Sequence, residues 1–303
     1  MLIIDPGIFT TIQDAGRWGY QSYGVPVSGA MDWFAFEIAN RLVGNSPNDA
    51  ALEIRSPISL QTDALQIVAL TGAVSFLKID GRIMPTWASV LVRAGSLIEI
   101  APQRAGGWRY LAVRGGIDVP RVLGSRSTDL RSKFGGLDGR ALQSGDQIVI
   151  GESIGDAVAY AGRFASAQAH RIYDRPSPIR IVPGPHADWF TLDALAQIVD
   201  SAYTLTDLAD RMGYRLSGAS LTRARRSELI SCGVTLGAMQ IPADGQPIVL
   251  MADHQTTGGY PIIANVIRAD MIKLAQRAPE EMIRFEWIDL AQAQQALIAM
   301  QNF

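Results

Sequence analysis

Residues 65–83 read LQIVALTGAVSFLKIDGRI, and this segment contains two short apolar runs that are typical of β-strands. The runs LQIVAL and VSFLKI are six residues long, and Gly72 stands between them. Asp80 and Gly81 follow the second run and precede a further strand-like segment. An Asp-Gly pair between two apolar segments is a strong signal for a tight hairpin turn. We therefore expect antiparallel strands that are joined at this position.

Comparable short runs recur along the whole chain, with turn residues about every ten positions. They are SVLVRA, SLIEIA, RYLAVR, QIVI, IRIV, PIVLMA and IRFEWI. Helical spacing occurs in fewer segments, which are MDWFAFEIANRLVG, ADWFTLDALAQIVDS, RADMIKLAQ and DLAQAQQALIAMQ. Because strands do not alternate regularly with helices, a Rossmann or TIM architecture is not expected. The pattern predicts a mainly β fold, with β-barrels covered by a few helices.

A change in composition after Ile150 indicates two lobes. The segment GESIGDAVAYAGRFASAQAHRIYDRPSP is rich in Ala, Gly and Ser and contains two prolines near its end. We interpret it as the connection between an N-terminal lobe, residues 1–160, and a C-terminal lobe, residues 161–303. Strands that cross between the lobes would move this boundary.

Composition narrows the classes of partner. Of the 303 residues, 48% are hydrophobic and 18% are charged, which predicts a sizeable core. The net charge of −2, with scattered Lys and Arg, argues against nucleic acid and against an anionic membrane surface as partners. The start lacks the basic region of a signal peptide, and the single cysteine, Cys232, allows no intramolecular disulfide. These features predict a cytosolic protein without a membrane span.

Familiar catalytic motifs are missing from the sequence. It contains no GxxxxGK[ST] phosphate loop, no GxGxxG after a strand and no GxSxG elbow. The three histidines, His170, His186 and His254, are far apart and lack zinc-like partners, so we expect no metal site.

The first of four polar, glycine-rich stretches is TIQDAGRWGYQSYGVPVSGAMD, residues 11–32. Its glycines permit close approach of a ligand, and the helix start behind it offers N–H groups to an anion. Arg17 could form a forked contact with a carboxylate or phosphate. The alternative is a loop that covers a barrel end, with Asp14 paired to Arg17 and with Ser28 or Asp32 as the helix cap.

The second stretch, residues 114–142, contains Arg126, Ser127, Thr128 and Asp129 in a turn-like run. Loops of this length are often functional, although a solvated basic loop is the alternative. The third stretch, LADRMGYRLSG at residues 208–218, is weak by itself. It suits an Asp210–Arg211 ion pair that caps a turn.

The fourth stretch, MADHQTTGGYPI at residues 251–262, follows the end of an apolar strand. Asp253 and His254 come first, and Gly258 and Gly259 could present consecutive N–H groups as a nest for an anion. A polar cluster of this kind at a strand end is the best candidate site in the sequence.

Together the four stretches resemble the motif set of the biotin-dependent carboxyltransferase family, also called the allophanate hydrolase subunit 2 family. The resemblance extends from residue 2 to about residue 286, in the family's order. It implies two cyclophilin-like β-barrel lobes. It also implies the role of the C subunit in an ATP-dependent 5-oxoprolinase, which acts with subunits A and B to hydrolyse 5-oxoproline to L-glutamate. ATP, with Mg, would serve the complex, and the isolated chain would be inactive.

Two other functions stay open. Related sequences are fused into urea carboxylase, so a carboxyltransferase component that uses biotin is one alternative. The chain has no fused carboxylase and no biotin-accepting MKM segment, which favours the 5-oxoprolinase role. The other alternative is a regulatory protein that antagonises a kinase inhibitor, as described for some relatives.

The implied chemistry assigns roles to the motif residues. Opening a lactam requires acid–base groups, donors for a phosphate or oxyanion, and a cation for the substrate carboxylate. Asp253, His254 and Asp14 are the catalytic candidates, and Arg17 or Arg126 is the carboxylate clamp. The full set of candidates for substrate or phosphate binding is Gln13, Arg17, Tyr20, Ser28, Asp32, Arg126, Ser127, Asp129, Gln255, Thr256, Thr257, Gly258, Gly259 and Tyr260. We expect the first, second and fourth stretches to line one cleft.

Overall fold

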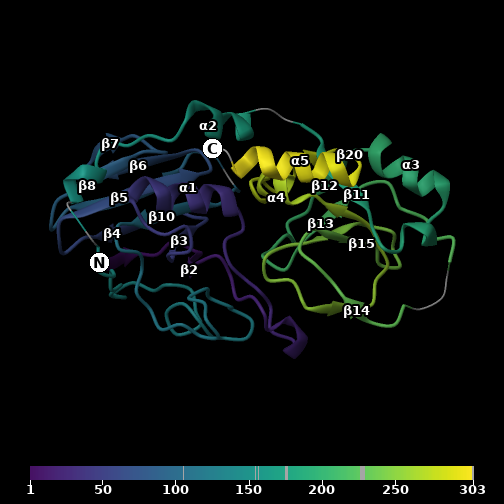
Figure 1. Cartoon of the computed structure of the whole chain (residues 1–303), viewed down its shortest axis with the longest axis horizontal. Helices are drawn as coiled ribbons and strands as arrows, with labels where there is room; N and C mark the ends of the chain where they lie inside the picture. The colour runs from purple at the N-terminus through teal and green to yellow at the C-terminus, as the bar shows by residue number, and fades with distance from the viewer. Residues whose placement is uncertain (105, 154, 156, 175–176, 226–228, 302–303) are drawn as a thin grey trace. The chain divides into compact units, whose positions relative to one another are not determined.

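The computed structural model describes residues 1–104, 106–153, 155, 157–174, 177–225 and 229–301, and the chain divides into two compact units (Figure 1). Unit 1 comprises residues 1–18 and 28–166, and unit 2 comprises residues 19–27 and 167–303. Strands dominate both units, so the predicted mainly β fold with a few helices is confirmed.

Unit 1 contains two five-stranded sheets whose neighbouring strands are all antiparallel. The first sheet has the order β1 (Leu2–Asp5), β4 (Ile58–Gln61), β9 (Leu97–Pro102), β6 (Ser75–Ile79) and β7 (Arg82–Met84). The second sheet has the order β2 (Thr10–Gln13), β3 (Ala51–Ile54), β10 (Arg109–Val113), β5 (Gln66–Gly72) and β8 (Ser89–Val92).

One apolar core joins the two sheets of unit 1. Leu60 and Ile98 of the first sheet belong to the same buried cluster as Leu52 and Leu111 of the second. Side chains alternate between the two faces of a strand, so each strand contributes every second residue to this core. Full burial of one such side chain stabilises the fold by about 1.5–3 kcal/mol. The resulting sheets provide a rigid base for the loops at their ends.

The Asp-Gly turn has the predicted geometry. Strands β6 and β7 pair with Ile79 opposite Arg82, which leaves Asp80 and Gly81 as the two turn residues. Their φ angles are 50° and 76°, and two positive φ angles define the hairpin turn that matches the twist of the strands.

Helix α1 (Trp33–Val43) lies in unit 1 and begins directly after the first polar stretch. Asp32 is its cap, because the Asp32 side chain accepts a hydrogen bond from the Ala35 N–H at 3.0 Å. Gly44 ends the helix with φ of 77°. Of the two caps that the sequence allowed, the structure therefore selects Asp32 over Ser28.

Unit 2 is built around an eight-stranded sheet that nearly closes into a barrel. Its order is β19 (Met282–Ile283), β12 (Tyr203–Leu205), β13 (Gly213–Ser217), β16 (Ile248–Leu250), β15 (Ala238–Gln240), β18 (Ile262–Val266), β11 (Ile179–Pro183) and β20 (Phe285–Trp287). The two edge strands, β19 and β20, are separated in the chain only by Arg284. A separate ribbon pairs β14 (Cys232–Gly233) with β17 (Thr257–Gly258).

The described residues also form further helices. In unit 2 these are α2 (Ala167–Asp174), α3 (Leu192–Asp200), α4 (Arg268–Ala275) and α5 (Leu290–Gln301), with short 3-10 turns at Gln21–Tyr23 and Ala187–Trp189. A further 3-10 turn of unit 1 spans Ala157–Tyr160. Helices α4 and α5 lie side by side within unit 2 (Figure 1).

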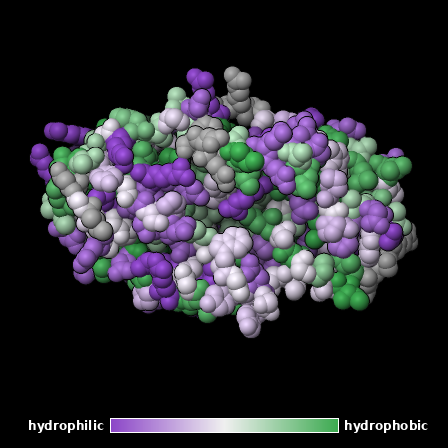
Figure 2. Space-filling model, in the orientation of Figure 1, coloured by the Kyte–Doolittle hydropathy of each residue, from purple (hydrophilic) through white to green (hydrophobic). Residues whose placement is uncertain are grey.

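The predicted helices α1, α3, α4 and α5 are confirmed, whereas two expectations differ from the structure. Helix α2 lies in the segment that we interpreted as a plain connection. The run QIVI forms no regular strand and contacts its neighbours through single bridges, Leu2 to Gln147 and Ile117 to Ile150. No helix among the described residues is long and apolar enough to cross a membrane. Figure 2 shows hydrophilic and hydrophobic side chains interspersed over the face in view.

Candidate functional site

In unit 1, the Asp14 carboxylate organises the second polar stretch. Its Oδ1 accepts hydrogen bonds from the Ser125 hydroxyl at 2.6 Å and the Ser127 hydroxyl at 2.5 Å. Its Oδ2 accepts from the Arg126 N–H at 2.6 Å, and Gly16 N–H donates to Oδ1 at 2.8 Å. Charge-assisted hydrogen bonds of this kind are the strong ones. Asp14 therefore fixes residues 125–127 against the end of β2.

Arg17 binds the same segment from the first stretch. Its Nε donates to the Val122 carbonyl at 2.9 Å, and its Nη2 donates to the Ser127 carbonyl at 2.8 Å. The guanidinium also stacks on the Phe134 ring, 4.6 Å from its centroid. Arg17 is fully buried, so these contacts use the cation to hold the loop.

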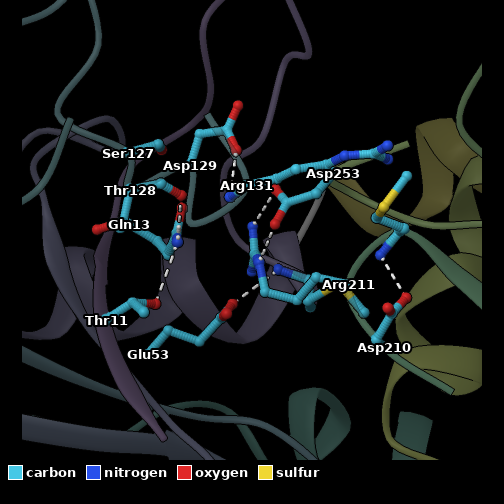
Figure 3. A network of polar contacts seen from close by, with 12 residues as sticks. Thr11, Gln13, Glu53, Ser127, Thr128, Asp129, Arg131, Asp210, Arg211 and Asp253 are labelled. Carbon is cyan, nitrogen blue, oxygen red and sulfur yellow. Dashed lines mark hydrogen bonds and ion pairs between the residues drawn. The ribbon is translucent and has the colours of Figure 1, made fainter. Parts of the chain in front are cut away.

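Gln13 and Thr128 connect the two stretches at the end of β2. The Gln13 amide nitrogen donates to the Thr11 hydroxyl and to the Thr128 carbonyl, both at 3.1 Å (Figure 3). In return, the Thr128 N–H donates to the Ile12 carbonyl at 3.0 Å. Gln13 Oε1 is buried without a hydrogen-bond partner.

Asp129 follows Thr128 and forms a turn of its own. Its Oδ1 accepts from the N–H groups of Arg131 at 3.0 Å and Ser132 at 3.1 Å (Figure 3). Its Oδ2 is buried without a partner, as is the Ser28 hydroxyl. Ser28 has φ of 57°, and a non-glycine residue with positive φ is often associated with a functional site. The burial of Ser127, Thr128 and Asp129 excludes the solvated basic loop that we considered for this run.

The other candidates of unit 1 differ in exposure. Arg126 donates through Nε to the Val119 carbonyl at 2.9 Å and through Nη2 to Asp118 at 2.5 Å, and its side chain is 20% exposed. Asp32 caps α1, and its own N–H donates to the Tyr110 hydroxyl at 2.8 Å.

Glu53 is a buried carboxylate near this helix start that the sequence analysis did not identify. It accepts from the Tyr110 hydroxyl at 2.8 Å and the Met31 N–H at 2.9 Å (Figure 3). Burial raises the pKa of Tyr110 well above its ordinary value, and the neighbouring Glu53 and Asp32 add to the shift. A glutamate at a buried position of a strand, in ALEI, was the only signal for it in the sequence.

In unit 2, Asp253 forms a bidentate ion pair with Arg211. The Arg211 Nε and Nη2 groups donate to the two carboxylate oxygens at 2.7 and 2.8 Å (Figure 3). Asp210, the partner that we expected for Arg211, instead accepts from the N–H groups of Met212 and Gly213 and closes their turn. The third and fourth stretches are therefore joined by a charge pair.

His254 is a buried, neutral imidazole. Burial is the main cause that lowers its pKa below 6.5, against smaller opposing effects of the Gln255 carbonyl and Asp253. Its Nδ1 lies 2.6 Å from the Gln255 carbonyl, which can only accept. Nδ1 must therefore carry the proton, which leaves a lone pair on Nε2. His254 is thus prepared to accept a proton or a hydrogen bond at Nε2.

Gln255 and Gly258 surround the Gln240 side chain. The Gln255 amide nitrogen lies 3.4 Å from Gln240 Oε1. A Cβ on Gly258 would come within 2.5 Å of the Gln240 amide nitrogen. Gly258 belongs to β17, and neither Gly258 nor Gly259 has the positive φ that a nest of N–H groups requires.

The remaining candidates lie nearer the surface of unit 2. Thr256 accepts a hydrogen bond from the Val234 N–H at 3.0 Å through its carbonyl. Thr257, Gly259 and Tyr260 are exposed, and Tyr20 is half-buried. The structure thus brings together Gln13, Asp14, Arg17, Ser127 and Asp129 in unit 1. In unit 2 it brings together Asp253, His254 and Gln255. The predicted single cleft stays a prediction.

Within the described residues, no cluster of three or more His, Cys, Asp or Glu side chains could hold a metal ion. The chemistry available to each unit therefore comes from imidazole, carboxylate, amide and guanidinium groups.

Comparison with known proteins identifies close relatives. The chain is 41% identical to the C subunit of the 5-oxoprolinase of Escherichia coli (strain K12), over 99% of this chain and 95% of the relative. It is 37% identical to the C subunit of the 5-oxoprolinase of Haemophilus influenzae, over 96% of this chain and 92% of the relative.

Among solved structures, the Kluyveromyces lactis urea carboxylase matches with a TM-score of 0.91 and 28% identity. The match covers 99% of this chain but only 28% of the urea carboxylase chain. The family model described as carboxyltransferase domain, subdomain A and B, matches residues 23–287. These findings confirm the resemblance seen in the four sequence stretches. The chain therefore belongs to the carboxyltransferase domain family, subdomains A and B.

Proposed function

We propose that this chain is the C subunit of an ATP-dependent 5-oxoprolinase of the cytosol, which acts with subunits A and B to hydrolyse 5-oxoproline to L-glutamate. One observation carries the proposal: two relatives with this name align over nearly their whole length at 37% and 41% identity. The more distant urea carboxylase is a far longer protein.

The chemistry of the lactam explains why such an enzyme needs ATP. Amide resonance makes the lactam carbonyl a poor electrophile, and phosphorylation of its oxygen would create a good leaving group. We assign ATP, with Mg, to the complete complex.

His254 is the best proton acceptor in the described chain for this reaction. An efficient general base has a pKa near or below the working pH and an accessible lone pair. His254 is neutral at pH 7, and the Gln255 carbonyl fixes its tautomer so that Nε2 is the basic atom. We propose that Nε2 accepts the proton of the attacking water.

Asp253 and Asp14 act on the site through their partners. Each carboxylate is saturated by donors, Asp253 by Arg211 and Asp14 by the 125–127 segment. A carboxylate that is held in this way is a weak base. We therefore propose Asp253 as the residue that positions the His254 backbone and Asp14 as the residue that positions Arg126.

Arg126 is the better of the two candidates for the carboxylate clamp. The Arg17 guanidinium is fully buried against main-chain carbonyls, whereas the Arg126 side chain is 20% exposed. An arginine at a partly exposed site can bind a carboxylate through two hydrogen bonds.

The proposal is tested by an assay of ATP-dependent glutamate formation from 5-oxoproline. The chain alone should show no turnover, and co-expression with the A and B partners should restore it. Turnover by the isolated chain would contradict the partner requirement. A full complex without ATP-dependent turnover would contradict the function itself.

The similarity to urea carboxylase supports a second candidate, a component of a biotin-dependent carboxyltransferase. In that case the complex should carboxylate urea when a biotinylated partner is present, and 5-oxoproline should not stimulate ATP hydrolysis. The same two substrates in one assay therefore separate the candidates.

A further inference from the structure

Gln13 presents a buried oxygen that can only accept a hydrogen bond. The residue is 0% exposed, and its Oε1 has no partner. The orientation of the amide is fixed, because the nitrogen faces the Thr128 carbonyl at 3.1 Å and a carbonyl cannot donate. A flipped amide would place two acceptors against each other. Oε1 is therefore an acceptor without a donor.

Asp129 presents a second oxygen of the same kind. The N–H groups of Arg131 and Ser132 hold its Oδ1, which orients the carboxylate. Its Oδ2 has no partner, although the residue is only 1% exposed. Burial of a polar atom without a hydrogen bond is costly, and most buried polar atoms in native proteins are satisfied.

The two residues adjoin in a rigid part of unit 1. Gln13 contacts the carbonyl of Thr128, the residue before Asp129, and Thr128 itself is bonded to Ile12 of β2 (Figure 3). The Asp129 main chain pairs with Phe134 in both directions. Neither side chain is a surface group that moved by chance into contact, because both are anchored at their other polar atoms.

We propose that Gln13 Oε1 and Asp129 Oδ2 form an acceptor pair for the N–H group of an amide-type ligand. The inference rests on the proposed function, in which this ligand group is the lactam N–H of 5-oxoproline. Neither oxygen can donate when Asp129 is ionised. The pair therefore selects a ring nitrogen that bears hydrogen and rejects a ring oxygen, which would place acceptors against acceptors.

The test compares 5-oxoproline with 5-oxotetrahydrofuran-2-carboxylate, in which a ring oxygen replaces the N–H. Isothermal titration of the complete complex with each compound should show that the wild type binds the lactam at least about tenfold more tightly. This comparison needs no variant and is independent of any folding defect. Equal affinities for the two compounds would overturn the inference.

Asp129→Asn sharpens the test, because the amide oxygen can keep the bonds to Arg131 and Ser132 while an NH2 group replaces Oδ2. The variant should lose about tenfold in lactam affinity and should bind the ring-oxygen compound no worse than the wild type does. The matched control is Asp138→Asn, the same change at a 78% exposed side chain of the same loop, which should leave both affinities unchanged. Gln13→Met, which removes the other acceptor, should also reduce the preference.

Urea, which carries N–H groups but no ring, separates this inference from the proposed function. Binding of urea that Asp129→Asn weakens, with no binding of 5-oxoproline, would reject the function and support the acceptor pair. A preference for the lactam that Asp129→Asn and Gln13→Met leave unchanged would reject the acceptor pair and leave the function standing. A complex that binds none of the three compounds would reject both, and an ordered water would then satisfy the two oxygens.

Discussion

Arg211 and Asp253 are 42 positions apart in the chain, and their side chains meet in two parallel hydrogen bonds of 2.7 and 2.8 Å. The main chain strengthens the contact, since the Asp253 N–H donates to the Arg211 carbonyl at 2.7 Å. Only 5% of the Arg211 side chain and 10% of the Asp253 side chain are exposed. The pair therefore holds the residues around His254 in a fixed position relative to β13.

Asp253→Ala should destabilise unit 2 strongly, because it leaves the Arg211 cation buried without its carboxylate. Removal of one partner of a buried pair costs about 3–5 kcal/mol. The free energy of unfolding, measured by urea titration with circular dichroism, checks this value. The matched control is Asp188→Ala, which breaks an ion pair of the same length, 2.7 Å, whose side chains are 62% and 55% exposed. That variant should lose at most about 1 kcal/mol, and equal losses in the two variants would contradict the prediction.

Local chemistry explains why most of the fold could be predicted from the sequence. The Asp80–Gly81 turn, the Asp32 cap and the Gly44 end each depend on residues within a few positions of one another. Helix α2 was missed because AQAHRIYD lies among Ala, Gly and Ser residues and has a low mean hydrophobic content. QIVI has the composition of a strand, but only single bridges connect it to its neighbours.

The candidate residues could be found from the sequence, but their partners could not. Asp14 bonds to hydroxyl groups 111 and 113 positions away, and no local pattern encodes such a distance. The expected pairing of Asp210 with Arg211 was a local guess, and the structure gives Arg211 a distant carboxylate. Glu53 was overlooked because a charged residue at a buried strand position has no signature apart from its apolar neighbours.

His254 should make the stability of the chain depend on pH. Its pKa in the folded state lies below 6.5, so the unfolded chain binds a proton first as the pH falls. The contribution is fully present above pH 6.5 and decreases as the pH drops from there toward the folded pKa. Urea titrations at a series of pH values from 5 to 7.5 should show this slope, and His254→Gln should reduce it. An identical slope in the variant would refute the assignment.

The same histidine should shape the activity profile of the complete complex. If Nε2 accepts a proton, kcat/KM should fall on the acid side with a midpoint below pH 6.5. His254→Gln should lower kcat far more than it raises KM, and it should abolish this acid limb. A residual activity with the wild-type limb would show that another group accepts the proton.

Asp14→Ala should disorganise the 125–127 segment, because the hydroxyl groups of Ser125 and Ser127 and the Arg126 N–H would lose their acceptor. Each unsatisfied buried group costs about 1–3 kcal/mol, so the free energy of unfolding should fall by about 3 kcal/mol or more. Hydrogen exchange should become faster at Arg126. Asp5→Ala is the control, because the exposed Asp5 carboxylate caps only the Gly7 N–H, and it should cost less than about 1 kcal/mol. A stable Asp14→Ala variant that lacks only turnover would indicate a directly catalytic Asp14.

The neighbouring glycines of the fourth stretch should respond differently to the same substitution. A Cβ on Gly258 would lie 2.5 Å from the Gln240 amide nitrogen and 3.3 Å from Val234. Gly258→Ala must therefore displace the buried Gln240 side chain, and we expect a loss of about 1–3 kcal/mol in the free energy of unfolding. On Gly259 the same Cβ meets its nearest atoms at 3.5 Å, which is ordinary contact, so Gly259→Ala should stay within about 0.5 kcal/mol of the wild type. Thermal and urea unfolding of the two variants side by side measure the difference. A Gly258→Ala variant as stable as Gly259→Ala would mean that Gln240 has room to move.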